Sequence, residues 1–173
     1  MFQLETERLS FSVFQEADWR EFLALSQDPE VMRHISGGDT WSEDKTRKWL
    51  ARQERNQQAY GYSRYKTSLK ATGELVGFCG LGNFGNTGEV EIGWWVKQSL
   101  WGKGLATEAA RAVKDHALGP LGLDHLISVC TPANTGSSRI MAKVGLRFRE
   151  ETTVEALGLP LDDLVVFVYT SEG

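Results

Sequence analysis

The chain has 173 residues, of which 41% are hydrophobic and 24% charged, and these proportions are typical of a globular domain with a buried core. Its net charge of −4 argues against nucleic-acid binding, and no apolar run reaches the roughly 18 residues that a membrane span requires. The two cysteines and three histidines lack the spacing of a disulfide framework or a metal site, so we expect a cytoplasmic protein with reduced thiols and without a metal. The chain length predicts a single domain over residues 1–173.

The first half of the chain alternates between patterns typical of strands and of helices. Residues 8–14 alternate between apolar and polar side chains, whereas Trp49 and Leu50 give an apolar face to a helix capped near Ser42. In chain order we predict a strand over 8–14, helices over 17–25 and 42–57 separated by a loop over 34–39, and strands over 60–69, 74–81 and 89–96. The last three strands follow one another through glycine turns, as in an antiparallel meander.

The second half begins with a change to helical periodicity. Leu105, Ala109 and Val113 fall on one face of a helix that ends before Gly119. We then predict a strand over 125–131, a helix over 137–144 closed by Gly145, and strands over 147–157 and 161–170 that form a hairpin. This order predicts an α+β fold with a mixed, mostly antiparallel, seven-stranded sheet, about four helices and a central β-α-β crossover between two parallel strands, 89–96 and 125–131.

The most informative motif is the run Trp-Gly-Lys-Gly at residues 101–104, which follows a predicted strand and opens a predicted helix. Gly102 and Gly104 let the backbone curl around an anion, and the amides at a helix N-terminus bind phosphate. An ordinary tight connection explains the same glycines equally well, so both interpretations stay open at this point. The GxGxxG match at 80–85 is rejected as a dinucleotide motif, because a strand and not a helix follows it.

Several polar residues stand where they have either a structural or a functional role. Asn134 and Ser137 precede a predicted helix and Lys143 ends it, so helix capping and dipole stabilisation account for all three. Glu89 and Glu91 share one face of the strand 89–96. That face is either an exposed side of the sheet or part of a cleft in which one carboxylate acts as a general base.

Taken together, these segments resemble the GNAT N-acetyltransferase superfamily and, within it, the ribosomal-protein N-terminal acetyltransferase (RimJ/RimL-like) branch. The resemblance covers nearly the whole chain and rests on residues 4–9, on the strand and glycine turn over 91–109, and on Asn-x-x-Ser and Lys-x-Gly signatures over 134–146. It implies acetyl-CoA as co-substrate, with its pyrophosphate on the amides of 102–107 and its pantetheine arm along the end of the strand 89–96. The cofactor-binding residues that it implies are Trp94, Trp95, Val96, Trp101, Gly102, Lys103, Gly104, Leu105, Ala106, Thr107, Asn134 and Ser137.

The resemblance also implies direct transfer of the acetyl group to a primary amine in a ternary complex. Such an amine arrives protonated and needs a base, for which Glu91 is the candidate and Glu89 or a water the alternative. Ser137 is the candidate proton donor to the leaving thiolate, because Met141 occupies the position where many members carry a tyrosine. Ser99 stands where a Gln or Arg that contacts phosphate is common in the family.

The acceptor is the part of the function that the sequence leaves open. A protein N-terminus and a small-molecule amine, such as an amino acid or an antibiotic, are alternatives, as are another acyl-CoA donor and a non-catalytic acyl-CoA-binding module. We expect the loop over 34–41, the first two helices and the turn at 158–160 to select the acceptor, because loops carry specificity. Cys130 is more typical of inert packing than of an acylated thiol. An exposed edge strand in the C-terminal hairpin is compatible with a homodimer.

Overall fold

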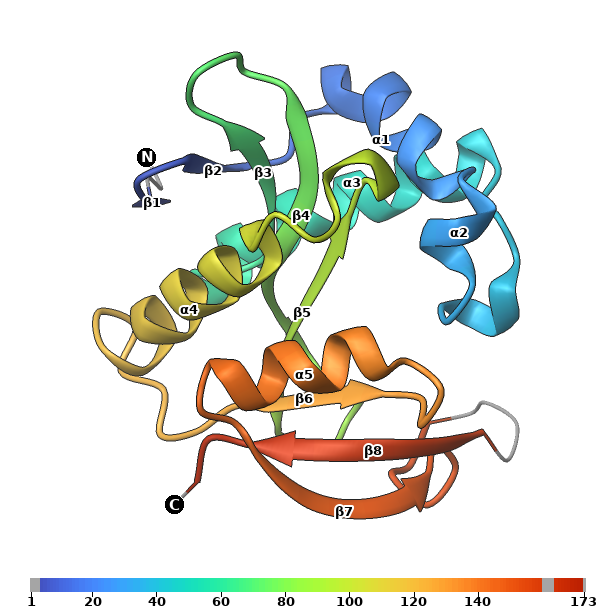
Figure 1. The fold of residues 1–173 in the computed structure, drawn as a ribbon, viewed down its shortest axis with the longest axis vertical. Helices are drawn as coiled ribbons and strands as arrows, with labels where there is room; N and C mark the ends of the chain where they lie inside the picture. Colours follow the sequence, from blue (N-terminus) through green and yellow to red (C-terminus); the bar gives the residue numbers. More distant parts are fainter. Residues whose placement is uncertain (1–3, 160–163, 173) are drawn as a thin grey trace.

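The computed structural model describes residues 4–159 and 164–172, in which eight strands form one mixed sheet in the order β1-β2-β3-β4-β5-β6-β8-β7 (Figure 1). Of the neighbouring pairs, β5 and β6 run parallel and the others antiparallel. The strands are β1 (Leu4–Glu5), β2 (Leu9–Val13), β3 (Arg64–Leu69), β4 (Leu75–Asn83), β5 (Val90–Val96), β6 (Ile127–Cys130), β7 (Arg147–Thr153) and β8 (Val165–Thr170). The α-helices are α1 (Trp19–Ser26), α2 (Pro29–Met32), α3 (Glu43–Tyr60), α4 (Leu105–Leu118) and α5 (Thr135–Lys143), and short 3₁₀ turns cover Glu16–Asp18, Ser36–Gly38 and Gln98–Leu100.

The predicted fold class is confirmed, but the predicted number of strands is wrong. The sheet is mixed and mostly antiparallel, four helices have eight residues or more, and the crossover runs from β5 through α4 to β6. The eighth strand is β1, which pairs with β2 because the amide of Thr6 donates to the carbonyl of Leu9 (2.9 Å) and turns the chain back on itself. Two residues are too few to show a period in the sequence.

Most predicted boundaries differ from the structure by one or two residues, and larger differences occur at the start of β3 and the end of β7. Helix α3 continues to Tyr60, where Gly61 in the left-handed conformation (φ 78°) ends it, so residues 60–63 do not belong to β3. Strand β7 ends at Thr153 instead of residue 157, and a turn follows; Pro160 and residues 161–163 lie outside the described part of the chain. The rejection of the GxGxxG match is confirmed, because residues 80–83 are part of strand β4.

Helices cover both faces of the sheet, and β5 contributes side chains to both cores. On one face, Val113 of α4 packs in a cluster with Ile92 of β5. On the other face, Phe22 of α1 and Trp49 of α3 pack with Trp95 of β5, whose ring is parallel to that of Phe22 at a centroid distance of 5.9 Å. Within the described residues, none of the helices has the length and apolar character needed to cross a bilayer.

Strands β5 and β6 meet at one end and then diverge, which shapes the site described below (Figure 1). Their parallel register joins Glu91 with Ile127, and the hydroxyl of Ser128 donates to the carbonyl of Ile92 (2.8 Å). Beyond that point β5 continues to Val96, paired on its other side with β4. The last residues of β5 therefore border a wedge between the two strands.

Candidate active site

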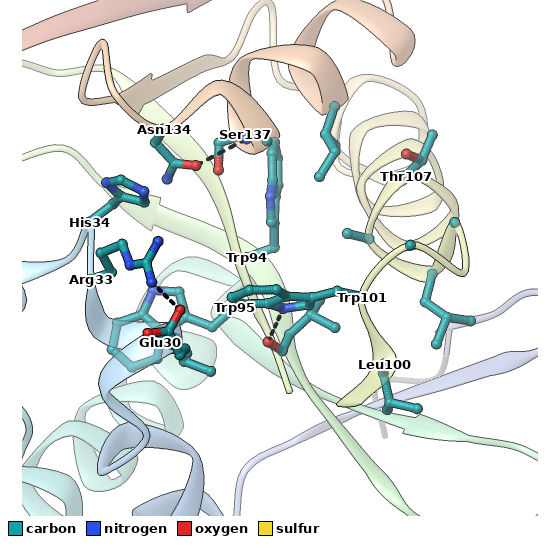
Figure 2. A pocket seen from close by; sticks show the side chains of 18 of the residues that line it. Glu30, Arg33, His34, Trp94, Trp95, Leu100, Trp101, Thr107, Asn134 and Ser137 are labelled. Atoms are coloured by element: carbon teal, nitrogen blue, oxygen red, sulfur yellow. Dashed lines mark hydrogen bonds and ion pairs between the residues drawn. The ribbon is translucent and has the colours of Figure 1, made fainter. Parts of the chain in front are cut away.

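A cavity of about 550 Å³ lies between the end of β5 and helix α5, a volume typical of small-molecule sites (Figure 2). Its walls come from four segments that are far apart in the sequence: α2 with the residues after it, the end of β5, the glycine turn with the start of α4, and α5. The lining residues are Glu30, Val31, Arg33, His34, Ile35, Trp94, Trp95, Val96, Leu100, Trp101, Gly102, Gly104, Leu105, Ala106, Thr107, Asn134, Gly136, Ser137, Ile140 and Lys143.

The structure brings the predicted cofactor-binding residues together around this one cavity, with a single exception. Lys103 is not among the lining residues; its backbone carbonyl instead accepts a hydrogen bond from Arg8 (2.9 Å). The predicted catalytic residue Ser137 also lines the cavity, whereas Glu91 does not. The roles of all these residues stay predictions.

The glycine turn has the geometry of an anion site. Gly102 (φ 73°) and Gly104 (φ 75°) both adopt the left-handed conformation, and α4 starts directly after them. The first bond of the helix runs from the amide of Glu108 to the carbonyl of Gly104 (3.0 Å), so the amides of the three residues before Glu108 have no acceptor within the helix. Because they lie at the positive end of the helix dipole, these amides fit a phosphate group.

The end of β5 offers backbone and aromatic surface to the same cavity. Trp94, Trp95 and Val96 line it, and the indole N–H of Trp101 donates to the carbonyl of Val96 (2.8 Å). This bond fixes the Trp101 side chain, which is about half exposed, at the rim of the cavity. A chain of amides would find both hydrogen-bonding backbone and apolar walls here.

Helix α5 presents polar groups to the cavity, and the capping interpretation of Asn134 is correct. The side-chain oxygen of Asn134 accepts a hydrogen bond from the amide of Ser137 (3.2 Å) and so caps the helix. Figure 2 shows both side chains on the cavity side of α5, and Lys143 lines the cavity from the last turn of this helix. Helix capping and ligand binding are therefore compatible for the same residues.

The two candidate carboxylates, Glu91 within β5 and Glu89 directly before it, are held by arginines outside the cavity. Glu91 forms an ion pair with Arg64 of β3 (Oε2 to Nη2, 2.5 Å), and Glu89 forms one with Arg149 of β7 (Oε1 to Nη1, 2.6 Å). Their side chains are exposed to the same small extent, 20% for Glu91 and 21% for Glu89. Glu91 lies where β5 and β6 meet, and Arg64 crosses the backbone of Gly93 to reach it.

The wall formed by α2 was not predicted as a helix. Asp28 caps it by accepting from the amide of Glu30 (2.9 Å), and proline at the first helical position suits this start. Glu30 and Arg33 form an ion pair on this wall, and His34 lies opposite Asn134 (Figure 2). An Asp-Pro pair was the available sequence signal, but four helical residues carry too little periodicity to be recognised.

Two residues near the site face the protein interior. Met141, at the position where a tyrosine is common, is 1% exposed and belongs to the core under α4. Burial raises the pKa of the Cys130 thiol to about 11, so this thiol is protonated at neutral pH and is a poor nucleophile.

Similarity to known proteins agrees with this geometry. Residues 8–147 match the acetyltransferase (GNAT) domain family. The uncharacterised protein YkkB of Bacillus subtilis is 32% identical over 149 residues, which cover 84% of this chain and 86% of that protein.

Solved structures with the same fold cover essentially the whole chain. An acetyltransferase from Agrobacterium tumefaciens is 25% identical, with a TM-score of 0.84 over 100% of this chain and 95% of the other. The RimL ribosomal-protein α-N-acetyltransferase in complex with coenzyme A is 17% identical, with a TM-score of 0.80 over 98% of this chain and 97% of the other. The chain belongs to the GNAT family of acetyl-CoA-dependent N-acetyltransferases.

Proposed function

We propose that this protein, as a single domain, transfers the acetyl group of acetyl-CoA directly to a primary amine of a protein N-terminus or a small molecule, within a ternary complex. The observation that carries the proposal is the cavity that joins the glycine turn of α4, the diverging end of β5 and the polar face of α5. It matches the three parts of the donor: phosphate, amide chain and thioester.

Three of the four walls of the cavity suit parts of acetyl-CoA, which supplies the acetyl group as a thioester. The amides of 102–107 bind the pyrophosphate, and the backbone at the end of β5 pairs with the pantetheine amides. Asn134 binds the pantetheine region from α5, where its amide group is free to donate while its oxygen caps the helix. The α2 wall, with Glu30, Arg33 and His34, is left to contact the acceptor.

The reaction requires a base to remove a proton from the acceptor amine and an acid to protonate the departing thiolate. Glu91 receives the proton of the acceptor ammonium through a water, because its carboxylate lies behind the cavity beside Arg64. Arg64 orients this carboxylate. The hydroxyl of Ser137, on the cavity side of α5, passes a proton to the departing CoA thiolate and regains one from the attacking nitrogen as the amide forms, so the serine ends the step unchanged.

The acceptor is tested by measuring CoA thiol release from acetyl-CoA against peptides with free N-termini, amino acids, polyamines and aminoglycosides. Release that depends on one amine class supports the transfer and identifies the acceptor. Acetyl-CoA binding without release for any amine would favour a non-catalytic acyl-CoA-binding module. Protein that binds no acetyl-CoA would overturn the proposal.

Replacing the Ser137 hydroxyl is expected to lower kcat. Ser137→Ala removes the proposed proton donor. We expect kcat to fall by about 100-fold, the lower end of what a positioned general acid contributes, because a thiolate leaves readily even without protonation. Ser138→Ala is the matched control, since the Ser138 hydroxyl is exposed and donates to the carbonyl of Thr135 (3.1 Å). Steady-state kcat at saturating acetyl-CoA measures the difference; equal values for the two variants would remove Ser137 from the acid role.

A further inference from the structure

The glycine turn is held from outside the cavity by residues near the N-terminus. Glu108, in the first turns of α4, accepts hydrogen bonds from the hydroxyl of Thr6 (Oε1, 2.6 Å) and from the backbone amide of Arg8 (Oε1, 3.0 Å). The Arg8 guanidinium donates to the other carboxylate oxygen through Nε (2.6 Å) and pairs with it through Nη2 (2.6 Å). Segments about 100 residues apart in the sequence therefore meet at the start of α4.

The same guanidinium also reaches the turn itself. Its Nη1 donates to the carbonyl of Lys103 (2.9 Å), the residue between the two left-handed glycines. Nη2 lies 3.6 Å from the position that a side chain on Gly104 would take. One planar arginine fork thus joins the turn to the first part of the helix, a geometry that a lysine cannot reproduce.

We propose that Arg8, with Thr6 and Glu108, is a positioning clamp that holds the glycine turn in the conformation that binds the pyrophosphate of acetyl-CoA. The inference rests on the proposed function, because it requires the pyrophosphate to bind at this turn. The clamp residues do not line the cavity, so they act through the backbone of 102–107 and not by touching the ligand.

The charges of the clamp are better explained by positioning than by attraction of the ligand. Glu108 places a carboxylate next to an anion site, where charge alone opposes phosphate binding. Burial acts to raise the pKa of Glu108, but hydrogen bonds from Thr6 and Arg8 outweigh it and lower the pKa, so the carboxylate is ionised and engaged in the clamp at neutral pH. A left-handed turn flanked by such a network is fixed before the ligand arrives.

The test compares the binding of CoA with that of pantetheine, which lacks the pyrophosphate. Arg8→Gln, Arg8→Lys and Glu108→Gln are made in the full chain, and the dissociation constants are measured by calorimetry for CoA and by displacement for pantetheine. Each variant is expected to bind CoA about tenfold more weakly, the effect of losing one charge-assisted hydrogen bond, with pantetheine binding unchanged. The direction in which Glu108→Gln changes the affinity for CoA is decisive. If only electrostatic attraction mattered, removal of this negative charge would strengthen CoA binding.

Glu5→Gln is the matched control. Glu5 lies in the same N-terminal segment as Thr6 and Arg8, but its carboxylate pairs with Lys70 (2.9 Å) and not with the glycine turn. It is expected to bind CoA like the wild type, and thermal melting of every variant verifies that the protein is folded. Tighter CoA binding by Glu108→Gln, or equal losses for CoA and pantetheine, would overturn the clamp. A wild-type protein that binds no CoA would instead overturn the proposed function, and the clamp with it.

Discussion

Gly102→Val is expected to lower kcat/KM for acetyl-CoA by about 100-fold, mainly through KM, while the protein remains folded. A branched side chain at φ 73° is strained, although nothing lies within 4 Å of the position that its Cβ would take. The turn relieves the strain by rotating its backbone, and rotation moves the amides that we propose bind the pyrophosphate. Kinetics with acetyl-CoA and the dissociation constant of CoA measure the loss.

Gly73→Val is the matched control for this substitution. Gly73 lies in the turn between β3 and β4 at φ 74°, and its missing side chain also has nothing within 4 Å. The two variants therefore introduce the same backbone strain in similarly open space, and their melting temperatures are expected to fall by similar amounts. If Gly73→Val weakened CoA binding as much as Gly102→Val, the effect would be a general loss of stability and not a local loss of the anion site.

The glycine turn could be predicted from the sequence because its determinants are local. Two glycines with one residue between them, placed directly before an apolar helical pattern, permit the left-handed conformation and indicate the helix start. The same holds for the cap at Asn134, whose partner Ser137 is three residues away. That residues around these two motifs belong to one site was implied by the family resemblance and not by the local pattern, and except for Lys103 the residues it implied line one cavity.

Features that depend on distant partners could not be predicted in this way. Arg64 reaches Glu91 across 27 residues, and Arg8 reaches Glu108 across 100, so no spacing rule connects either pair. Short elements were missed for a different reason. Strand β1 has two residues and helix α2 has four, too few for a hydrophobic periodicity to be visible in the sequence. Helix α2 was therefore missed although it forms one wall of the cavity.

Glu91→Gln is expected to lower kcat by about 100-fold or more, the usual contribution of a general base, with little change in CoA affinity. The amide can accept a hydrogen bond from Arg64 and water but cannot take a proton, so the local structure is kept while the proposed chemistry is lost. Single-turnover kinetics with a saturating acceptor measure the chemical step, and a CoA titration measures the binding of the donor product.

Glu89→Gln separates this role from the loss of an ion pair. Both carboxylates are about one-fifth exposed and are held by an arginine, Glu91 within β5 and Glu89 directly before it, so the stability of the two variants is expected to fall alike. They differ in position, because Glu91 stands where β5 and β6 begin to diverge, two residues closer to the cavity. A kcat that falls only in Glu91→Gln therefore assigns the base to Glu91. A fall only in Glu89→Gln assigns it to Glu89, and unchanged turnover in both leaves water or the acceptor itself to carry the proton.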